Sequence, residues 1–588
     1  MLRREFLRDT FILASSLVLE PSTFFRANEI ASASERVARI LNDEYPWPYP
    51  VKEMESAERI VFVDKNQAVV NIFPAKGKNF DVKFYHAPEE KMLPFSQPIQ
   101  FSNVKEPLDI KFNFEGPQLA YRVEYREGKE KWRSLSPKTV KTPNFNLKDK
   151  DKDKVEILII ADDHCYADLR WAHKNKDGIW KDKIVNGEYI FELVKELLKD
   201  PFYCPEEKHR KCMPFGVLLA DMMAFIIRSE EPDIIINLGD TLGLETSVRE
   251  REWGPEMPKK NLNLGAQMLW ERLRRVWSPI TPWVMYDLAL GNHDGEEGYD
   301  PARPFGINWR LKLFRMPNEY SFQYKTKVPQ PRFGPVGNFA ISSLRGHEDY
   351  HLVKWGNDID LIILHASGYT PNYPLTIDKW TLGAKQKEWF KRTLCSSSSL
   401  WKFVFSHNVI GGWPTSLVER IKVRPGIFTY AGTYRRGPLF SEIDYERYHD
   451  DPSMVEQTYL TELCRRNGVR AWFYGHDHVS KIKEIGKNYE GKMMIGMCCG
   501  GPRFTSNNFY KILHYERWLE NYGDPDVYPP SVYTGPGIVK LTITSEQVII
   551  NYLTSARVCL SNRAVGGYSN LPPNKLPGDV IYNYRLER

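Results

Sequence analysis

Short apolar stretches alternate with polar residues between about residues 60 and 147. They read RIVFV, AVVNIF, FDVKFYH, LDIKFNF and QLAYRVEYREG, with turn-forming residues between them. A hydrophobic period of two is typical of strands that bury one face, and no stretch of helical period intervenes. The pattern predicts a small antiparallel β-sandwich at residues 50–147.

A charged segment, LKDKDKDK at residues 147–154, follows this region. Its alternating charges offer almost nothing to a hydrophobic core, so we interpret residues 148–154 as a linker.

Beyond the linker the pattern changes to nearly continuous apolar runs separated by longer segments. The runs VEILIIA, DIIINLG, WVMYDLAL, DIDLIILH, KFVFSH and RAWFYG predict strands that are covered on both faces. GAQMLWERLRRVW and AKQKEWFKRTL predict helices between them, and KMMIGM, GIVKLTI and QVIINYL predict later strands. The order indicates a layered α/β domain at residues 155–555. Residues 556–588, rich in Pro, Gly and Asn, are predicted to form an irregular tail.

Size and composition set the outer limits of this interpretation. A chain of 588 residues is too long for one ordinary core, and 42% hydrophobic residues suffice for two globular domains. The net charge of +6 is not gathered in a dense basic block, so it neither requires nor excludes a nucleic-acid surface.

The cysteines exclude some classes of site. The eight cysteines form no CxxC pair, which argues against a zinc ribbon, a thioredoxin-like site or a small disulfide framework. Cys204 and Cys212 flank a polar loop and are interpreted either as a local disulfide or as two free thiols. Cys498 and Cys499 follow an apolar run and are predicted to be buried.

The N-terminus resembles a twin-arginine export signal. LRREFLR precedes FILASSLVL, and the small residues Ala31, Ser32 and Ala33 mark a cleavage site; Leu2 stands where Ser or Thr is usual. The alternative is an ordinary amphipathic helix. We interpret residues 1–33 as a signal peptide read by the twin-arginine export machinery, which predicts a periplasmic or secreted protein. No later run reaches 18 apolar residues, so no membrane span is expected in the mature chain.

Candidate ligands follow five of the predicted strands. These strands end in Asp162, Asp163 and His164; Asp240; Asn292, His293 and Asp294; His407; and His476 and His478. In open α/β sheets functional groups gather at the carboxyl ends of strands. The donor set holds imidazoles and oxygens but no thiolate, which suits two borderline metal ions with one Asp bridging them. FYGHDHVS taken alone permits either a pair of metal ligands or a polar turn with two solvated histidines.

The motif order DxH, GD, GNHD, H and GHxH resembles the calcineurin-like metallophosphoesterase superfamily, which includes purple acid phosphatases, 5′-nucleotidases and DNA-repair nucleases. The resemblance spans residues from about 155 to 555. It implies a four-layer α/β/β/α sandwich, here preceded by a small all-β sandwich domain. It also implies hydrolysis of phosphate esters by a metal-activated water or hydroxide.

The resemblance also implies a role for each candidate residue. The first metal would bind Asp162, His164 and His478, the second would bind Asn292, His407 and His476, and Asp240 would bridge the two. His293 would not bind a metal; it would face the phosphate and stabilise charge or protonate the departing oxygen, and Asp294 would orient it. Two divalent or mixed-valence ions are expected, and Mn, Fe and Zn all suit these ligands.

Two features depart from purple acid phosphatases, which also carry an N-terminal β-sandwich. Their second motif reads GDxxY with an iron-bound tyrosine, whereas Gly243 of GDTLG stands at that position here. Their first motif lacks the histidine that His164 supplies. We therefore expect no iron–tyrosinate colour.

Other polar residues leave alternatives open. His365 also ends an apolar run and is a second candidate for the middle ligand; we prefer His407 because its helix and strand resemble the family's, and expect His365 to line the pocket. Asp163 and Asp477 are expected to support neighbouring ligands or turns. Arginines in Gly/Pro-rich stretches are interpreted as phosphate contacts or as surface residues: Arg435, Arg436 and Arg503. Five histidines in polar surroundings are predicted to be solvated: His173, His209, His347, His351 and His449.

The resulting hypothesis is an exported phosphatase or phosphodiesterase that acts on a small phosphoester. One alternative is an exported nuclease or nucleotide phosphodiesterase, because the DNA-repair branch shares DxH and GNHD. Another is a non-catalytic cell-surface binding protein that keeps the metal fold. Residues 165–230 and 295–350 are interpreted as insertions that shape substrate choice.

Overall fold

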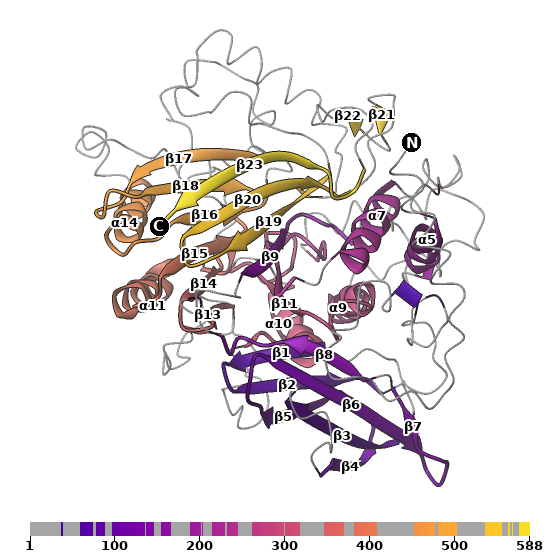
Figure 1. The fold of residues 1–588 in the computed structure, drawn as a ribbon. Coiled ribbons are helices and arrows are strands. Elements are labelled where there is room, and N and C mark those ends of the chain that lie inside the picture. Colours follow the sequence, from indigo (N-terminus) through magenta and orange to yellow (C-terminus); the bar gives the residue numbers. More distant parts are fainter. Residues whose placement is uncertain are drawn as a thin grey trace.

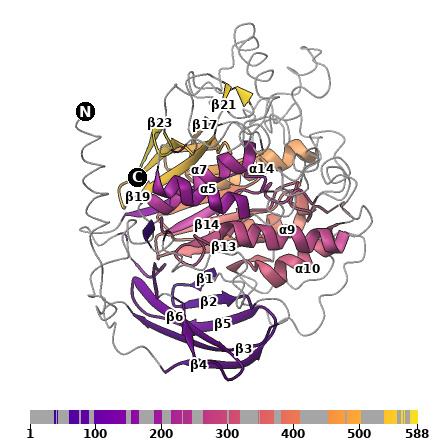
Figure 2. The same ribbon diagram turned by 90° about the vertical axis from the view of Figure 1, so that its right-hand side faces the viewer.

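The computed structural model of the chain is drawn in Figures 1 and 2. It describes residues 37, 38, 41, 59–74, 78–88, 97–135, 137–145, 147, 154–165, 188–200, 203, 214–229, 232–244, 262–298, 300, 302–317, 346–347, 349–369, 381–408, 452–476, 480–501, 536–555, 563–564, 567–568 and 576–588. Several predicted features lie outside these residues: the export signal at 1–33, nearly all of the linker, Cys204, Cys212, Arg435, Arg436, Asp477, His478 and Arg503.

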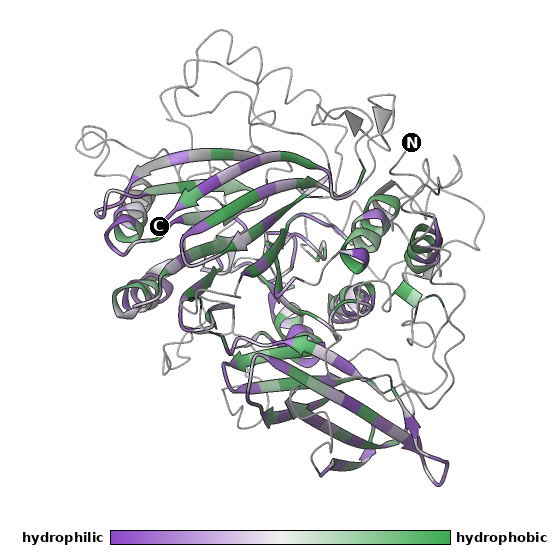
Figure 3. Cartoon of the chain, in the orientation of Figure 1, coloured by the Kyte–Doolittle hydropathy of each residue, from purple (hydrophilic) through white to green (hydrophobic). Residues whose placement is uncertain are grey.

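Two antiparallel sheets form the predicted β-sandwich, which lies below the rest of the chain in Figure 1. The first contains β1 (Arg59–Asp64), β2 (Gln67–Ile72) and β5 (Leu108–Asn113). The second contains β3 (Phe80–Pro88), β4 (Ile99–Val104), β6 (Gln118–Glu127), β7 (Arg133–Ser134) and β8 (Lys138–Lys141). Phe84 and Phe112 meet between the sheets with their ring centroids 4.7 Å apart. The strands alternate between apolar and polar residues, as Figure 3 shows, and the apolar set makes the core.

A six-stranded sheet begins the α/β part, in the order β11-β10-β9-β19-β20-β23. β9 (Val155–Ile160), β10 (Ile234–Asn237) and β11 (Met285–Leu288) are parallel. β19 (Gly537–Ile543), β20 (Gln547–Thr554) and β23 (Val580–Glu587) extend it in antiparallel fashion.

A seven-stranded sheet packs on the first, in the order β12-β13-β14-β15-β16-β18-β17. β14 (Ile359–Leu364), β15 (Trp401–Ser406), β16 (Ala471–Tyr474) and β18 (Met493–Cys498) are parallel. Antiparallel strands complete its edges: β12 (Gly346–His347), β13 (Tyr350–Trp355) and β17 (Lys481–Lys487).

Helices cover the outer faces of both sheets (Figure 1), so the expected mixed α/β fold is confirmed. Along β9, Ile157 and Ile159 point into the core between the sheets, whereas Leu158 and Ile160 join the outer core. That outer core contains α5 (Glu188–Lys199), α7 (Pro214–Arg228) and α9 (Leu262–Trp277), and α10 (Arg303–Leu313) lies beside α9. On the other side α11 (Gly383–Ser396) and α14 (Pro452–Arg466) cover the second sheet. Among the described helices, none is both long and apolar enough to cross a bilayer.

The β-sandwich packs directly against the α/β part. The amide of Ile60 donates to the Thr281 carbonyl at 3.0 Å, and the Tyr121 hydroxyl donates to the Pro282 carbonyl at 2.7 Å. Phe62 meets Trp355 of β13 edge-on, with centroids 6.0 Å apart. The sandwich therefore contacts the segment just before β11. This segment lies at the end of the sheet opposite the candidate ligands.

The prediction of an irregular tail at 556–588 is wrong for Val580–Glu587. These residues form β23, which pairs antiparallel with β20. Their sequence VIYNYRLE has strand character. The Pro- and Gly-rich residues before it obscured that signal, so the first sheet ends later in the sequence than predicted.

The segment 165–230 also differs from the expected insertion. Within it, α5 and α7 contribute buried residues such as Val194 and Met223 to the outer core. These two helices are part of the core of the fold, so the segment is not simply an insertion.

His351 is not solvated as predicted. It lies on β13 with no exposed surface, and its Nε2 is 2.8 Å from Oδ2 of Asp287 on β11. β13 pairs with β14, which places His351 between the two sheets. The polar appearance of the surrounding sequence concealed this burial.

Candidate metal centre

The loops after β9 and β10 bring the first candidate residues together. Because these strands are parallel neighbours, their carboxyl ends lie at one edge of the sheet. The amide of Asp162 donates to the Gly239 carbonyl at 2.9 Å, and the amide of His164 donates to the Asp240 carbonyl at 3.1 Å. Direct backbone bonds thus fix the two loops to each other.

The second sheet delivers its histidines to the same place. The amide of Gly475 donates to the His407 carbonyl at 3.1 Å, which ties together the loops after β15 and β16. The amide of His476 then donates to Oδ2 of Asp162 at 2.8 Å. A residue of one sheet therefore holds a candidate ligand from the other.

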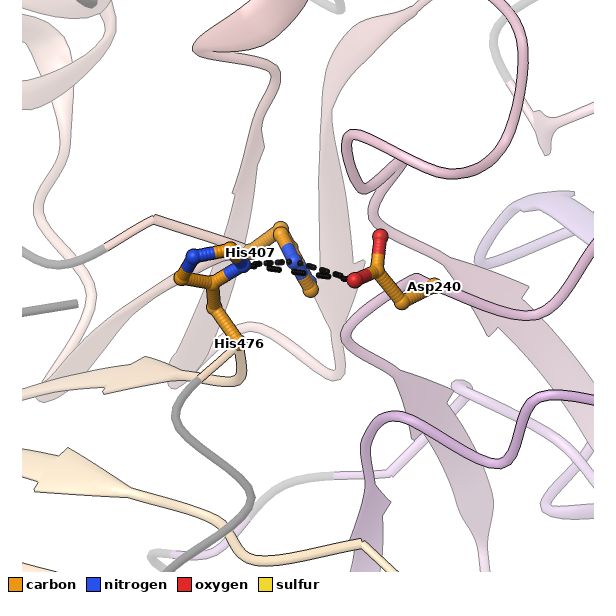
Figure 4. A group of neighbouring side chains, drawn as sticks. All are labelled: Asp240, His407 and His476. Carbon is orange, nitrogen blue, oxygen red and sulfur yellow. Dashed lines mark hydrogen bonds and ion pairs between the residues drawn. The ribbon is translucent and has the colours of Figure 1, made fainter. Parts of the chain in front are cut away.

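Two groups of side chains can each hold a metal ion. One consists of Asp162, His164 and Asp240, the other of Asp240, His407 and His476, and within each group the ligating atoms lie within 4.8 Å of one another. In Figure 4 the Asp240 carboxylate points toward both imidazoles. Its Oδ2 lies 3.1 Å from His407 Nε2 and 4.0 Å from His476 Nδ1. Asp240 belongs to both groups, so the geometry has the form of two adjoining sites.

Backbone strain is concentrated in these residues. Five described non-glycine residues have positive φ, and four of them are Asp162 (52°), His164 (42°), Asp240 (60°) and His476 (76°). Each such conformation costs on the order of 1–3 kcal/mol and persists only where the surrounding structure enforces it. The backbone conformations that place these side chains at the centre therefore lower the stability of the fold, as is common at functional sites.

Gly239 is required for the close approach of two of these loops. Its φ is +94°, and a Cβ there would lie 2.3 Å from the Gly291 amide nitrogen. We expect Gly239→Ala to lower the free energy of unfolding by about 1–3 kcal/mol more than a glycine replacement that suffers positive φ alone. Denaturant unfolding measures this difference.

Gly116 offers the matched control. Its φ is +86°, but a Cβ there meets nothing within 4 Å. Gly116→Ala should therefore show only the cost of the left-handed conformation, about 1–2 kcal/mol. Equal losses in the two variants would contradict the close approach at Gly239.

The electrostatics of the centre favour a cation. Burial by itself raises the pKa of the Asp240 carboxyl, but His407 and His293 outweigh it and hold that pKa below its usual value. Burial lowers the pKa of His407, while the Asp240 carboxylate raises it more strongly, to about 9. The Asp240 carboxylate that favours a proton on His407 would also favour a metal cation, which would compete with the proton for the imidazole.

Asn292 adds an oxygen that suits a metal. The residue is 7% exposed, and its buried Oδ1 accepts no hydrogen bond from the described residues. A buried amide oxygen without a donor costs about 1–3 kcal/mol. A cation at the neighbouring carboxylates would satisfy this oxygen, so Asn292 fits the donor set of a metal centre.

The family comparison agrees with this geometry. Residues 217–480 match the family model described as calcineurin-like phosphoesterase, and this range contains Asp240, Asn292, His407 and His476. Over residues 217–480 the chain is similar to calcineurin-like phosphoesterases. Its enzyme class is that of a metal-dependent phosphoesterase.

Solved structures with similar folds include a purple acid phosphatase and PhoD. The purple acid phosphatase PPD1 from yellow lupin (Lupinus luteus) seeds is 12% identical, with a TM-score of 0.46, covering 91% of this chain and 75% of that one. The structure of PhoD is 11% identical, with a TM-score of 0.49, covering 85% of this chain and 86% of that one. No curated protein matches the chain.

Asp294 holds the backbone of the centre. Its carboxylate accepts hydrogen bonds of 2.7–3.0 Å from the amides of Asp240, Thr241, Leu242 and Gly291, and one of 3.1 Å from the Thr241 hydroxyl. These bonds fix the loop that carries Asp240. An orienting role of Asp294 toward the His293 ring stays a prediction.

His293 lies on the open side of the centre. Its amide donates to Asp240 Oδ1 at 2.8 Å, and its Nε2 is 3.8 Å from Asp240 Oδ2. The His293 side chain is 21% exposed, whereas that of Asp240 is 1% exposed. Among the residues at the centre, His293 is therefore well placed to meet a substrate arriving from solvent.

Asp163 lies behind the ligands and outside both groups. Its Oδ2 accepts hydrogen bonds from Asn237 Nδ2 at 3.3 Å, Trp277 Nε1 at 3.3 Å and Cys165 Sγ at 3.4 Å. Burial raises the pKa of its carboxyl to about 7. These contacts tie the loop after β9 to Asn237 of β10 and to Trp277 of α9, and a supporting role for Asp163 stays a prediction.

The structure separates the two candidates for the middle histidine. His407 belongs to a group with Asp240, whereas His365 bonds to Asp349 and Ser367 and lies in neither group.

Cys498 and Cys499 are buried, as predicted. Sequence reasoning missed the polar residues around His365, including Asp349 and Arg303. The only signal for them was the run HASGY at the end of an apolar strand.

Proposed function

We propose that the chain hydrolyses small phosphate esters at a two-metal centre. The first metal would bind Asp162, His164 and His478, the second would bind Asn292, His407 and His476, and Asp240 would bind both. The membership of Asp240 in both groups of ligating atoms carries this proposal. Two adjoining cations neutralise phosphate oxygens and lower the pKa of an attacking water.

The protein's own residues divide the remaining tasks. His293 faces the phosphate from the open side and either stabilises charge on it or gives a proton to the departing oxygen. Asp294 keeps the Asp240 loop rigid through its four amide contacts. The strained loops hold the ligands in place before substrate arrives, which reduces the reorganisation needed during reaction.

The test compares a monoester with a diester after controlled metal loading. The full chain is stripped with a chelator, reloaded separately with Mn²⁺, Zn²⁺ or Fe²⁺, and assayed on p-nitrophenyl phosphate and on its bis ester. We expect hydrolysis that depends on added metal. A preference for the diester would favour a nuclease or nucleotide phosphodiesterase. Metal binding without turnover of any ester would favour a binding protein and refute the proposal.

We also infer that residues 1–33 direct export through the twin-arginine machinery, which the sequence LRREFLR supports. The double replacement Arg3→Lys and Arg4→Lys should retain the protein in the cytoplasm of a host that has this machinery. Arg8→Lys, outside the arginine pair, is the control and should be exported. Cell fractionation measures the outcome, and equal export of all three proteins would refute the inference.

A further inference from the structure

A buried polar network lies one strand away from the candidate metal centre. Nδ1 of His365 is 3.2 Å from Oδ2 of Asp349, and its Nε2 is 2.9 Å from Oγ of Ser367. The Tyr369 hydroxyl donates to Oδ1 of Asp349 at 2.9 Å, and Arg303 Nη2 lies 3.7 Å from Oδ2 of the same carboxylate. The five residues connect a strand end, a short turn and the start of α10.

The network is firmly fixed on its own sheet. β14 and β15 are parallel, and Leu364 pairs with Ser406, so His365 leaves its strand beside His407. The Gln386 side chain binds the His365 backbone at both its amide (2.9 Å) and its carbonyl (2.8 Å). A Cβ on Gly368 would lie 2.5 Å from the His365 ring, so the turn closes tightly on the imidazole.

The same turn holds the loop that carries Asn292 and His293. The amide of Gly298, at the far end of that loop, donates to the Ser367 carbonyl at 3.1 Å. Arg303, just beyond the loop, donates through Nη1 to the Gly368 carbonyl. The segment after β11 is therefore attached to the network at two points.

A second anchor closes the loop from the α10 side. Arg310 and Glu296 form a fully buried ion pair with N–O distances of 2.6 and 3.1 Å. A Cβ on Gly306 would lie 2.6 Å from the Gly295 carbonyl oxygen, so the helix packs directly on the loop. Within the described part of the chain, the turn at Ser367 and Gly368 links this loop to the second sheet.

We propose that Asp349, His365 and Ser367 are positioning residues that hold loop 291–298 so that Asn292 and His293 face Asp240. Buried charges of this kind cost free energy unless they are fully bonded. What they offer over an apolar core is one fixed geometry. This proposal rests on the proposed function, because that function is what assigns metal binding to Asn292 and phosphate contact to His293. It predicts effects on the second metal and on turnover rather than on overall stability alone.

The experiment compares Asp349→Asn with His351→Gln in the full chain. His351 is the matched control, because it forms another buried His–Asp contact, with Asp287 at 2.8 Å, on the neighbouring strand β13. We expect Asp349→Asn to weaken one of two Mn²⁺ binding steps about tenfold and to lower kcat about tenfold, with KM changed less than twofold. His351→Gln should keep both binding steps and kcat, even where its melting temperature falls.

Ser367→Ala provides a milder variant if Asp349→Asn does not fold. It removes only the Oγ contact to His365, and we expect a loss of about threefold in kcat and in the same Mn²⁺ step. If the variants match His351→Gln in both measurements, the network is a structural contact and the proposal is overturned. Calorimetric Mn²⁺ titration needs no turnover. A wild-type chain that binds two Mn²⁺ but hydrolyses no ester would refute the proposed function and still test the network.

Discussion

Asp240→Asn is expected to lower kcat by at least about a thousandfold, which corresponds to about 4 kcal/mol in the activation free energy. Asp240 is the carboxylate that both groups of ligating atoms share, and it is 1% exposed. The Asn side chain keeps the shape of Asp but lacks the negative charge that would attract two cations. Metal content per chain should therefore fall together with activity, and both are measured on the same purified preparation.

Asp360→Asn is the control for the loss of a buried carboxylate. Asp360 is also fully buried, but it lies near the amino end of β14 and accepts hydrogen bonds from Ser397 and Ser399. An amide oxygen can accept part of the same bonds, so this variant should keep its metals and its rate. Near-normal metal content and rate in Asp240→Asn would contradict a bridging role.

His293→Ala is expected to lower kcat by about 10²–10⁴-fold while the metal content stays unchanged. The reason is its position: its Nε2 lies 3.8 Å from Asp240 Oδ2, and its side chain is more exposed than those of the described candidate ligands. Steady-state kinetics and metal analysis of the same variant measure the two effects. His86→Ala, in strand β3 of the sandwich, is the control and should keep full activity.

The leaving group separates the two possible tasks of His293. Protonation matters little for p-nitrophenol, a good leaving group, but matters greatly for an alkoxide. A proton donor therefore predicts a much larger loss on an alkyl phosphate than on p-nitrophenyl phosphate. Equal losses would indicate charge stabilisation. Full activity of His293→Ala on both esters would remove the residue from the mechanism, and loss of metal would make it a ligand.

The layers of the α/β part were predictable because parallel strands are buried on both faces and appear as continuous apolar runs. Their carboxyl ends converge, which is why Asp162, Asp240 and His407 could be grouped before any geometry was known. The local signal failed where an element depends on distant partners. β23 pairs with β20, and the burial of His351 requires Asp287 of the opposite sheet.

The supporting contacts were harder to predict than the candidate ligands. The motif GNHD indicates that Asp294 matters, but not that its carboxylate binds the amides of a loop about fifty residues earlier. Nor does a sequence reveal that Asp162 and His476 occupy left-handed backbone conformations. Both features arise only when distant parts of the chain come together. Asp294 and Asp240 follow neighbouring strands of the first sheet, whereas the bond from the His476 amide to Asp162 runs between the two sheets.

Anomalous X-ray scattering from crystals of the Mn²⁺-loaded protein tests the central claim most directly. The account predicts two peaks about 3.5–4 Å apart, one beside Asp162 and His164, the other beside His407 and His476, with Asp240 in contact with both. A single peak, or a pair of peaks that Asp240 does not touch, would contradict it.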